Sequence, residues 1–126
     1  MVNVTKMSKK TLLAVGGIII VLGLLFLLVI NPFSSGEVTV HISKSGFSPQ
    51  EVTPKKGQTV RWVNDDQTLH WPASNPHPTH ELYLGFDPGE PISPGGEWSF
   101  KFNNLGEWRY HDHLQPDKFG LVKVTH

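Results

Sequence analysis

The stretch GFSPQEVTPKKGQTVRWVN, residues 46–64, decides the fold. A short strand-like run is followed by a Lys-Gly turn, and then Val60 and Trp62 alternate with Arg61 and Val63. Successive strand residues point to opposite faces of a sheet, so this alternation is typical of a strand with one buried face. The stretch therefore predicts two strands joined by a turn.

The same pattern recurs along the rest of the chain. Strand-like segments occupy residues 37–43, 97–103, 106–113 and 119–126. No segment after residue 36 has the period of a long amphipathic helix. Short strands separated by glycine- and proline-containing turns predict an all-β domain over residues 37–126, built as an antiparallel sandwich or a small barrel.

The amino-terminal part of the chain is of a different kind. Residues 11–30, TLLAVGGIIIVLGLLFLLVI, carry no charge. As a helix they would be about 30 Å long, which matches the hydrocarbon core of a bilayer. We predict a transmembrane anchor at 11–30, a cytoplasmic amino terminus at 1–10 and a linker at 31–36. Three lysines before the anchor place the domain outside the cytoplasmic membrane as a single-pass protein. A cleaved signal peptide is the alternative.

Composition excludes several function classes. From Glu37 onward there are eight basic and eleven acidic residues, so the domain is mildly acidic and nucleic acid is not an expected partner. The chain has no cysteine, which rules out disulfides and thiolate metal ligands. No Ser-His-Asp spacing, phosphate-binding glycine loop or paired-carboxylate motif supports a hydrolase.

A long irregular segment separates Asn64 from Gly96. It is rich in proline but also contains Trp71, Tyr83 and Phe86, side chains in which disordered linkers are poor. We therefore expect a packed loop over one end of the sandwich. Three of the seven histidines lie in this loop.

Histidines cluster in two short stretches. His111 and His113 are two apart on a strand and share a face, with Asp112 directed to the other side. His77 and His80 flank a proline in the loop, and both stretches are expected at the same end of the sandwich. Imidazole and carboxylate ligands suit Cu(II), Zn(II) or Ni(II). The two remaining histidines outside the loop, His41 and His126, are interpreted as ordinary surface residues.

The segments GFSPQEVTPKKGQTVRWVNDDQTLH, GEWRYHDH and GLVKV resemble the cupredoxin family, which includes plastocyanin and azurin, across essentially all of residues 37–126. The resemblance implies an antiparallel Greek-key β-sandwich and a copper ligand at His70. Asp112 stands where the family has its copper-binding cysteine, and the family's downstream histidine and methionine have no clear match. WRYHDH also resembles the histidine-containing segment of multicopper oxidases.

Together these patterns predict a metal site with His70, His80, His111 and His113 as ligands. His77 could exchange places with His80. Asp112 is expected either to bind the metal or to accept a hydrogen bond from a ligand imidazole. The expected metal is copper as Cu(II), with zinc as the alternative, and without a thiolate the site cannot be a blue copper centre.

The sequence thus predicts a membrane-anchored copper-binding protein that handles copper or exchanges electrons slowly, with a copper-delivery or redox protein as partner. A binding protein is favoured over an enzyme. One alternative is a copper-dependent oxidase whose sites form between subunits. The other is a metal-free interaction module.

Overall fold

The computed structural model describes residues 36–126, and every regular element within them is a β-strand. The strands are β1 (Val38–Ser43), β2 (Gly46–Ser48), β3 (Glu51–Val52), β4 (Thr59–Asn64), β5 (Pro72–Ser74), β6 (Glu97–Lys101), β7 (Gly106–Asp112) and β8 (Gln115–Val124). The predicted all-β domain is therefore confirmed.

The predicted membrane segment lies outside the described residues. This holds for the cytoplasmic stretch 1–10, the anchor at 11–30 and all but the last residue of the linker at 31–36. Within residues 36–126, no helix is long and apolar enough to cross a membrane.

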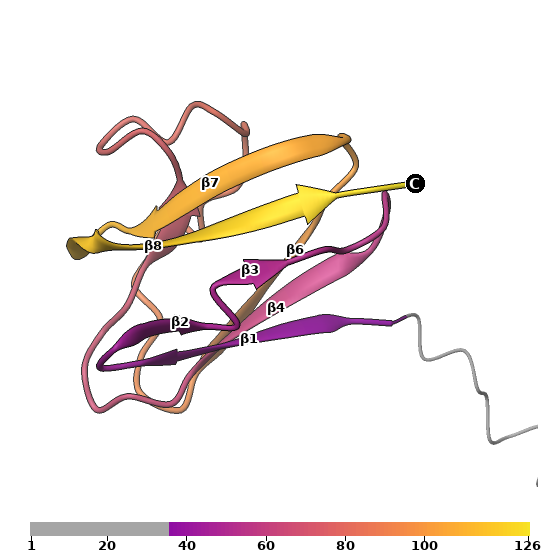
Figure 1. Ribbon diagram of the computed structural model, residues 1–126. Helices are drawn as coiled ribbons and strands as arrows, with labels where there is room; N and C mark the ends of the chain where they lie inside the picture. The colour runs from indigo at the N-terminus through magenta and orange to yellow at the C-terminus, as the bar shows by residue number, and fades with distance from the viewer. Residues whose placement is uncertain (1–35) are drawn as a thin grey trace, which may run out of the picture. The chain divides into compact units, whose positions relative to one another are not determined.

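Two four-stranded sheets form the layers of a sandwich (Figure 1). One sheet has the strand order β2-β1-β4-β6, and the other has the order β3-β8-β7-β5. The long β7–β8 hairpin forms the centre of the second sheet and runs the length of the domain. It also carries the sequence stretch with two of the clustered histidines.

Both sheets are mixed, which differs from the purely antiparallel arrangement expected. β1 pairs with β4 in parallel, with Val40 opposite Trp62, and β3 pairs with β8 in parallel, with Val52 opposite Val122. The parallel pairing of β1 and β4 reflects the path of the chain between them. After β2 the chain crosses to the other sheet, where it forms β3, and it then returns to the first sheet as β4, which runs beside β1 in the same direction.

The core lies between the sheets and is largely aromatic. β4 alternates as predicted, with Val60 and Trp62 buried. The Trp62 ring packs against Phe86 at 5.1 Å and edge-on against Tyr110 at 5.5 Å between ring centroids. Because Phe86 comes from the long loop and is fully buried, the loop is part of the core.

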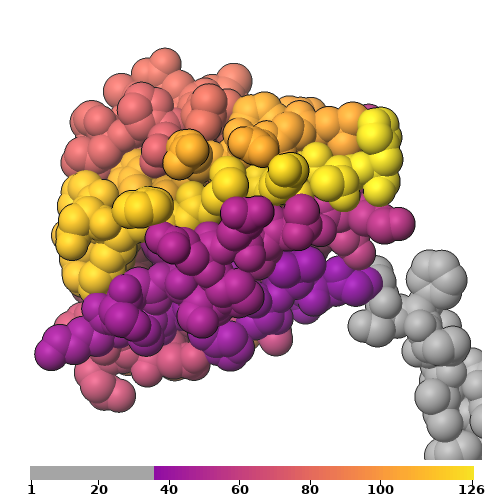
Figure 2. Space-filling view, in the orientation of Figure 1, coloured from indigo at the N-terminus to yellow at the C-terminus, as the bar shows by residue number. Residues whose placement is uncertain are grey.

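The loop between β4 and β6 covers one end of the β7–β8 layer, as Figure 2 shows for the residues around 70–90. It contains the short strand β5, which pairs with β7 so that Ala73 lies opposite His111. Sequence alternation did not predict β5, since it has only three residues and begins with a proline, which is tolerated at an edge strand. This pairing brings the loop histidines to β7.

Candidate metal centre

Four histidines meet on the outer side of β7. His77 and His80 come from the loop that follows β5, and His111 and His113 come from the end of β7. Each offers one ring nitrogen, and these four atoms lie within 4.8 Å of one another. We call His77, His80, His111 and His113 the outer cluster.

The nitrogen spacing in the outer cluster suits a single ion. Nδ1 of His77 lies 3.2 Å from Nε2 of His111, and Nε2 of His80 lies 3.0 Å from Nδ1 of His113. Two nitrogens that are each about 2.0 Å from a metal are separated by about 2.8 Å at a right angle and about 3.3 Å at the tetrahedral angle. The two closest pairs therefore have the spacing of ligands on one ion, and the other nitrogens lie within 4.8 Å.

The second ring nitrogens of two cluster members have partners of their own. Nδ1 of His80 lies 2.6 Å from Oδ2 of Asp87, and Nδ1 of His111 lies 2.8 Å from Oδ1 of Asn75. Oxygen acceptors at these positions require the proton on Nδ1, so Nε2 of each ring carries the free electron pair. That is the nitrogen which faces the rest of the cluster.

Electrostatics keep part of the cluster neutral. Burial lowers the pKa of His111 to about 4, and the neighbouring histidines act in the same direction because their positive forms would repel it. The pKa of His113 is lowered by the same causes, with burial first. A neutral imidazole is the form that binds a metal, so these two rings are ready to bind one at neutral pH.

Asp87 is ionised in this setting. Burial acts to raise the pKa of its carboxyl group, but hydrogen bonds from Gly89, His80 and Trp71 outweigh burial and lower that pKa. A fixed negative charge therefore lies beside the cluster.

His70 lies apart from the outer cluster. It is fully buried, with Nδ1 2.5 Å from Oδ2 of Asp112 and Nε2 2.9 Å from Oδ2 of Asp66. The hydrogen bond from His70 is the largest cause that lowers the pKa of Asp66 to about 2. Both ring nitrogens of His70 are thus directed at carboxylates, and neither is free for a metal.

Asp112 points into the domain, as the strand alternation predicts. Its Oδ2 accepts from His70, and its Oδ1 accepts from the backbone N–H groups of Trp71 and Leu114, each at 3.0 Å. Both of its carboxylate oxygens therefore accept hydrogen bonds from within the chain. We call His70 and Asp112 the inner pair, which is a closed hydrogen-bonded link and not part of the outer cluster.

The structure therefore brings together three residues of the predicted ligand set, His80, His111 and His113, and it adds His77, the predicted alternative to His80. His70 is the predicted residue left outside. Asn75 and Asp87 were not anticipated, because a polar residue in a proline-rich loop carries no periodic signal. Only the path of the loop places them beside histidines.

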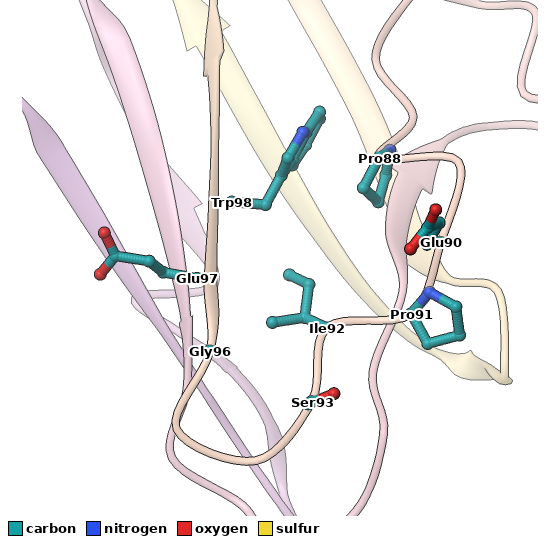
Figure 3. Close-up of a pocket in the computed structure, with 8 residues that line it drawn as sticks. All are labelled: Pro88, Glu90, Pro91, Ile92, Ser93, Gly96, Glu97 and Trp98. Carbon is teal, nitrogen blue, oxygen red and sulfur yellow. The ribbon is translucent and has the colours of Figure 1, made fainter.

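The outer cluster is also separate from the groove in Figure 3. This groove of about 310 Å³ lies between residues 88–93 and the start of β6. Pro88, Ile92 and Trp98 face one another across it, and Glu97 is directed away. No histidine is among its lining residues, so it offers no nitrogen ligand for a metal.

Solved cupredoxins share this fold. A purple cupredoxin from Nitrosopumilus maritimus has a TM-score of 0.62 and 24% identity, over 70% of this chain and 99% of that chain. A variant of amicyanin in its reduced Cu(I) form at pH 4 has a TM-score of 0.60 and 26% identity, over 74% and 86%. An oxidised amicyanin variant has a TM-score of 0.61 and 27% identity over the same shares.

No family model matches the chain. The structural similarity confirms the resemblance to cupredoxins, and the described residues have the cupredoxin fold.

Proposed function

We propose that this protein binds one copper ion, as Cu(II), through the four histidines of the outer cluster. The observation that carries the proposal is the convergence of four ring nitrogens within 4.8 Å from two separate segments. Imidazole suits copper and zinc, and Cu(II) leads the affinity order among divalent first-row metals. The amicyanin structures similar to this chain include a Cu(I) form, which favours copper over zinc.

The chemistry of the donor set separates this site from blue copper. A blue centre needs a cysteine thiolate, and the sequence has none. Bound copper would supply a one-electron couple in a nitrogen-only environment. The exposed ring of His77 leaves one side of the site open to solvent, and the other three imidazoles are more enclosed. This arrangement suits copper handling, by sequestration or delivery to a protein partner, or slow electron exchange.

Four ligands from one chain favour binding over catalysis. Catalytic metal sites keep an open coordination position, whereas four protein ligands fill a four-coordinate ion. The cluster also forms within a single chain, so it does not need a second subunit as an interfacial oxidase site would. We place the domain outside the cytoplasm, anchored in the cytoplasmic membrane by residues 11–30, on the basis of the apolar run and the lysines before it.

The test is a Cu(II) titration of the full-length chain in mild detergent, read by EPR and visible absorption, beside the double variant His111→Ala/His113→Ala. We expect one equivalent of copper, wide copper hyperfine splitting and weak colour, all lost in the double variant. A parallel Zn(II) competition should leave copper bound. Absence of stoichiometric binding would contradict the proposal and favour the metal-free interaction module.

The same titration has a pH dependence. Because protons compete with the metal for imidazole nitrogens, the affinity should fall as the pH is lowered from 8 to 5. An affinity that stays constant over this range would show that imidazoles are not the ligands.

A further inference from the structure

We propose that Asp87 is the positioning residue of the metal centre, because its carboxylate orients His80 directly and His113 through Trp71. The proposal rests on the proposed function, since it concerns how the outer cluster presents its nitrogens to copper.

The first contact is with His80. Oδ2 of Asp87 accepts a hydrogen bond from Nδ1 of His80 at 2.6 Å. Because this carboxylate oxygen is the acceptor, the proton lies on Nδ1 and Nε2 keeps its electron pair. Nε2 is the atom that lies 3.0 Å from Nδ1 of His113 inside the cluster. Asp87 thereby selects which nitrogen of His80 can bind a metal.

The second contact is with Trp71. Its indole Nε1 donates to Oδ1 of Asp87 at 2.8 Å, and the indole packs against the ring of His113, with 4.8 Å between centroids and a tilt of 47° between the ring planes. The Asp87 carboxylate thus holds the indole of Trp71, which in turn packs against His113. The backbone N–H of Gly89 also donates to Oδ1 at 2.8 Å, so the carboxylate itself is held in place.

The backbone of His80 shows why such support is needed. His80 has a φ of 57°, the only positive φ of a non-glycine residue within residues 36–126. This left-handed conformation is unfavourable for a residue with a Cβ atom. It is held by a hydrogen bond from the His80 N–H to the carbonyl of Pro76 at 2.9 Å and by the Asp87 contact on the side chain. Strained residues of this kind persist where the surroundings fix them.

Asp87 differs from Asn75, which contacts His111 in the corresponding way. The acceptor from His111 is the amide oxygen of Asn75, whereas the acceptor from His80 is a carboxylate oxygen, which makes the imidazole it contacts a stronger electron donor. A stronger donor stabilises Cu(II) relative to Cu(I). Asp87 should therefore affect the reduction potential of the bound copper as well as its affinity.

The experiment compares Asp87→Asn with Asp65→Asn in the full-length chain, by Cu(II) titration, EPR and the copper reduction potential. Asp65 is a matched control, because its carboxylate contacts Nδ1 of His41 at 2.5 Å on the exposed surface and not in the cluster. We expect Asp87→Asn to bind one equivalent of copper about 10–100-fold more weakly, with a changed hyperfine splitting and a higher potential. Asp65→Asn should match the wild type.

Trp71→Phe is the second variant and guards against a folding defect. It retains an aromatic ring against His113 and removes the indole N–H that donates to Asp87. We expect Trp71→Phe to weaken copper binding and raise the potential, as Asp87→Asn does, but by less. The melting temperature of the metal-free protein should be nearly unchanged.

The outcomes separate the two proposals. If the wild type binds copper and Asp87→Asn has the same affinity, EPR spectrum and potential, the positioning role is overturned. If Asp87→Asn lowers only the melting temperature, its role is structural and the proposal also fails. If the wild type itself binds no copper, the proposed function fails first.

Discussion

The inner pair and the outer cluster lie on opposite sides of one strand and have opposite properties. Asp112 of the inner pair and His111 of the outer cluster are neighbours in β7, so their side chains point to opposite faces. Inside, His70 and Asp112 satisfy each other and are fully buried. Outside, four imidazoles are directed at one another, with one ring nitrogen of each within 4.8 Å of the others.

This difference can be related to the residue that stands where the resemblance to cupredoxins implies a cysteine. The resemblance to cupredoxins places a copper ligand at His70 and the missing cysteine at Asp112. A carboxylate at that position has closed the inner site with hydrogen bonds to His70 and to two backbone N–H groups. The inner pair then serves as a link between the β4–β5 connection and β7, and the proposed copper ligands are those of the outer cluster.

Removing a histidine from the outer cluster should have the largest effect on copper binding. His111→Ala deletes a buried ligand, so the Cu(II) affinity should fall by more than about 100-fold, beyond the range for a residue that only contacts a ligand. His41→Ala is the control, since His41 is exposed and outside the cluster. Isothermal titration with Cu(II) measures the affinity of both variants. An equal Cu(II) affinity in the two variants would contradict the assignment of copper binding to the outer cluster.

Breaking the inner pair should mainly affect stability. Asp112→Ala removes the acceptor from Nδ1 of His70 and from two backbone N–H groups, and each buried polar group left without a partner costs about 1–3 kcal/mol. Urea unfolding of the metal-free protein measures the change. A free energy of unfolding within about 1 kcal/mol of the wild-type value would show that the inner pair does not stabilise the fold as a link.

A change in the hairpin that carries both regions should destabilise them together. Gly120 of β8 lies opposite Tyr110, and a Cβ atom at this glycine would overlap the buried tyrosine ring, with Cε1 and Oη at 2.5 Å. Gly120→Ala is expected to cost about 1–3 kcal/mol, the usual range for overpacking in a core. Gly89→Ala is not a clean control because its φ is positive, so Ser99→Ala on the exposed side of β6 serves instead.

The smallest expected effect is a pH dependence near the inner pair. The pKa of Asp66 is lowered from 3.8 to about 2 in the folded state, mainly by the hydrogen bond from His70. A lowered folded pKa stabilises the fold above pH 3.8, and this contribution is lost as the pH falls from 3.8 towards 2. Asp66→Asn should therefore flatten the fall in melting temperature over that window.

Asp65→Asn provides the comparison for this effect. Its carboxylate is half exposed and contacts His41 rather than the inner pair. The melting curve of Asp65→Asn should follow the wild type more closely than that of Asp66→Asn. Identical curves for the two variants would contradict a specific contribution from the His70 contact.

Sequence patterns predicted the parts of the molecule that depend on alternation. The burial of Val60 and Trp62 and the inward direction of Asp112 follow from the two-residue period of a strand. The placement of His70 could not be predicted in this way, because its partners Asp66 and Asp112 come from a turn and from a distant strand. Likewise, the approach of His77 to His111 and of Asp87 to His80 depends on the path of the loop and on the β5–β7 pairing.

Diffraction at the copper absorption edge from copper-loaded crystals of the full-length chain tests the central claim most directly. We expect a single anomalous peak among the ring nitrogens of His77, His80, His111 and His113, with His70 still hydrogen-bonded to Asp112. A peak between His70 and Asp112, with the outer histidines unbound, would contradict it.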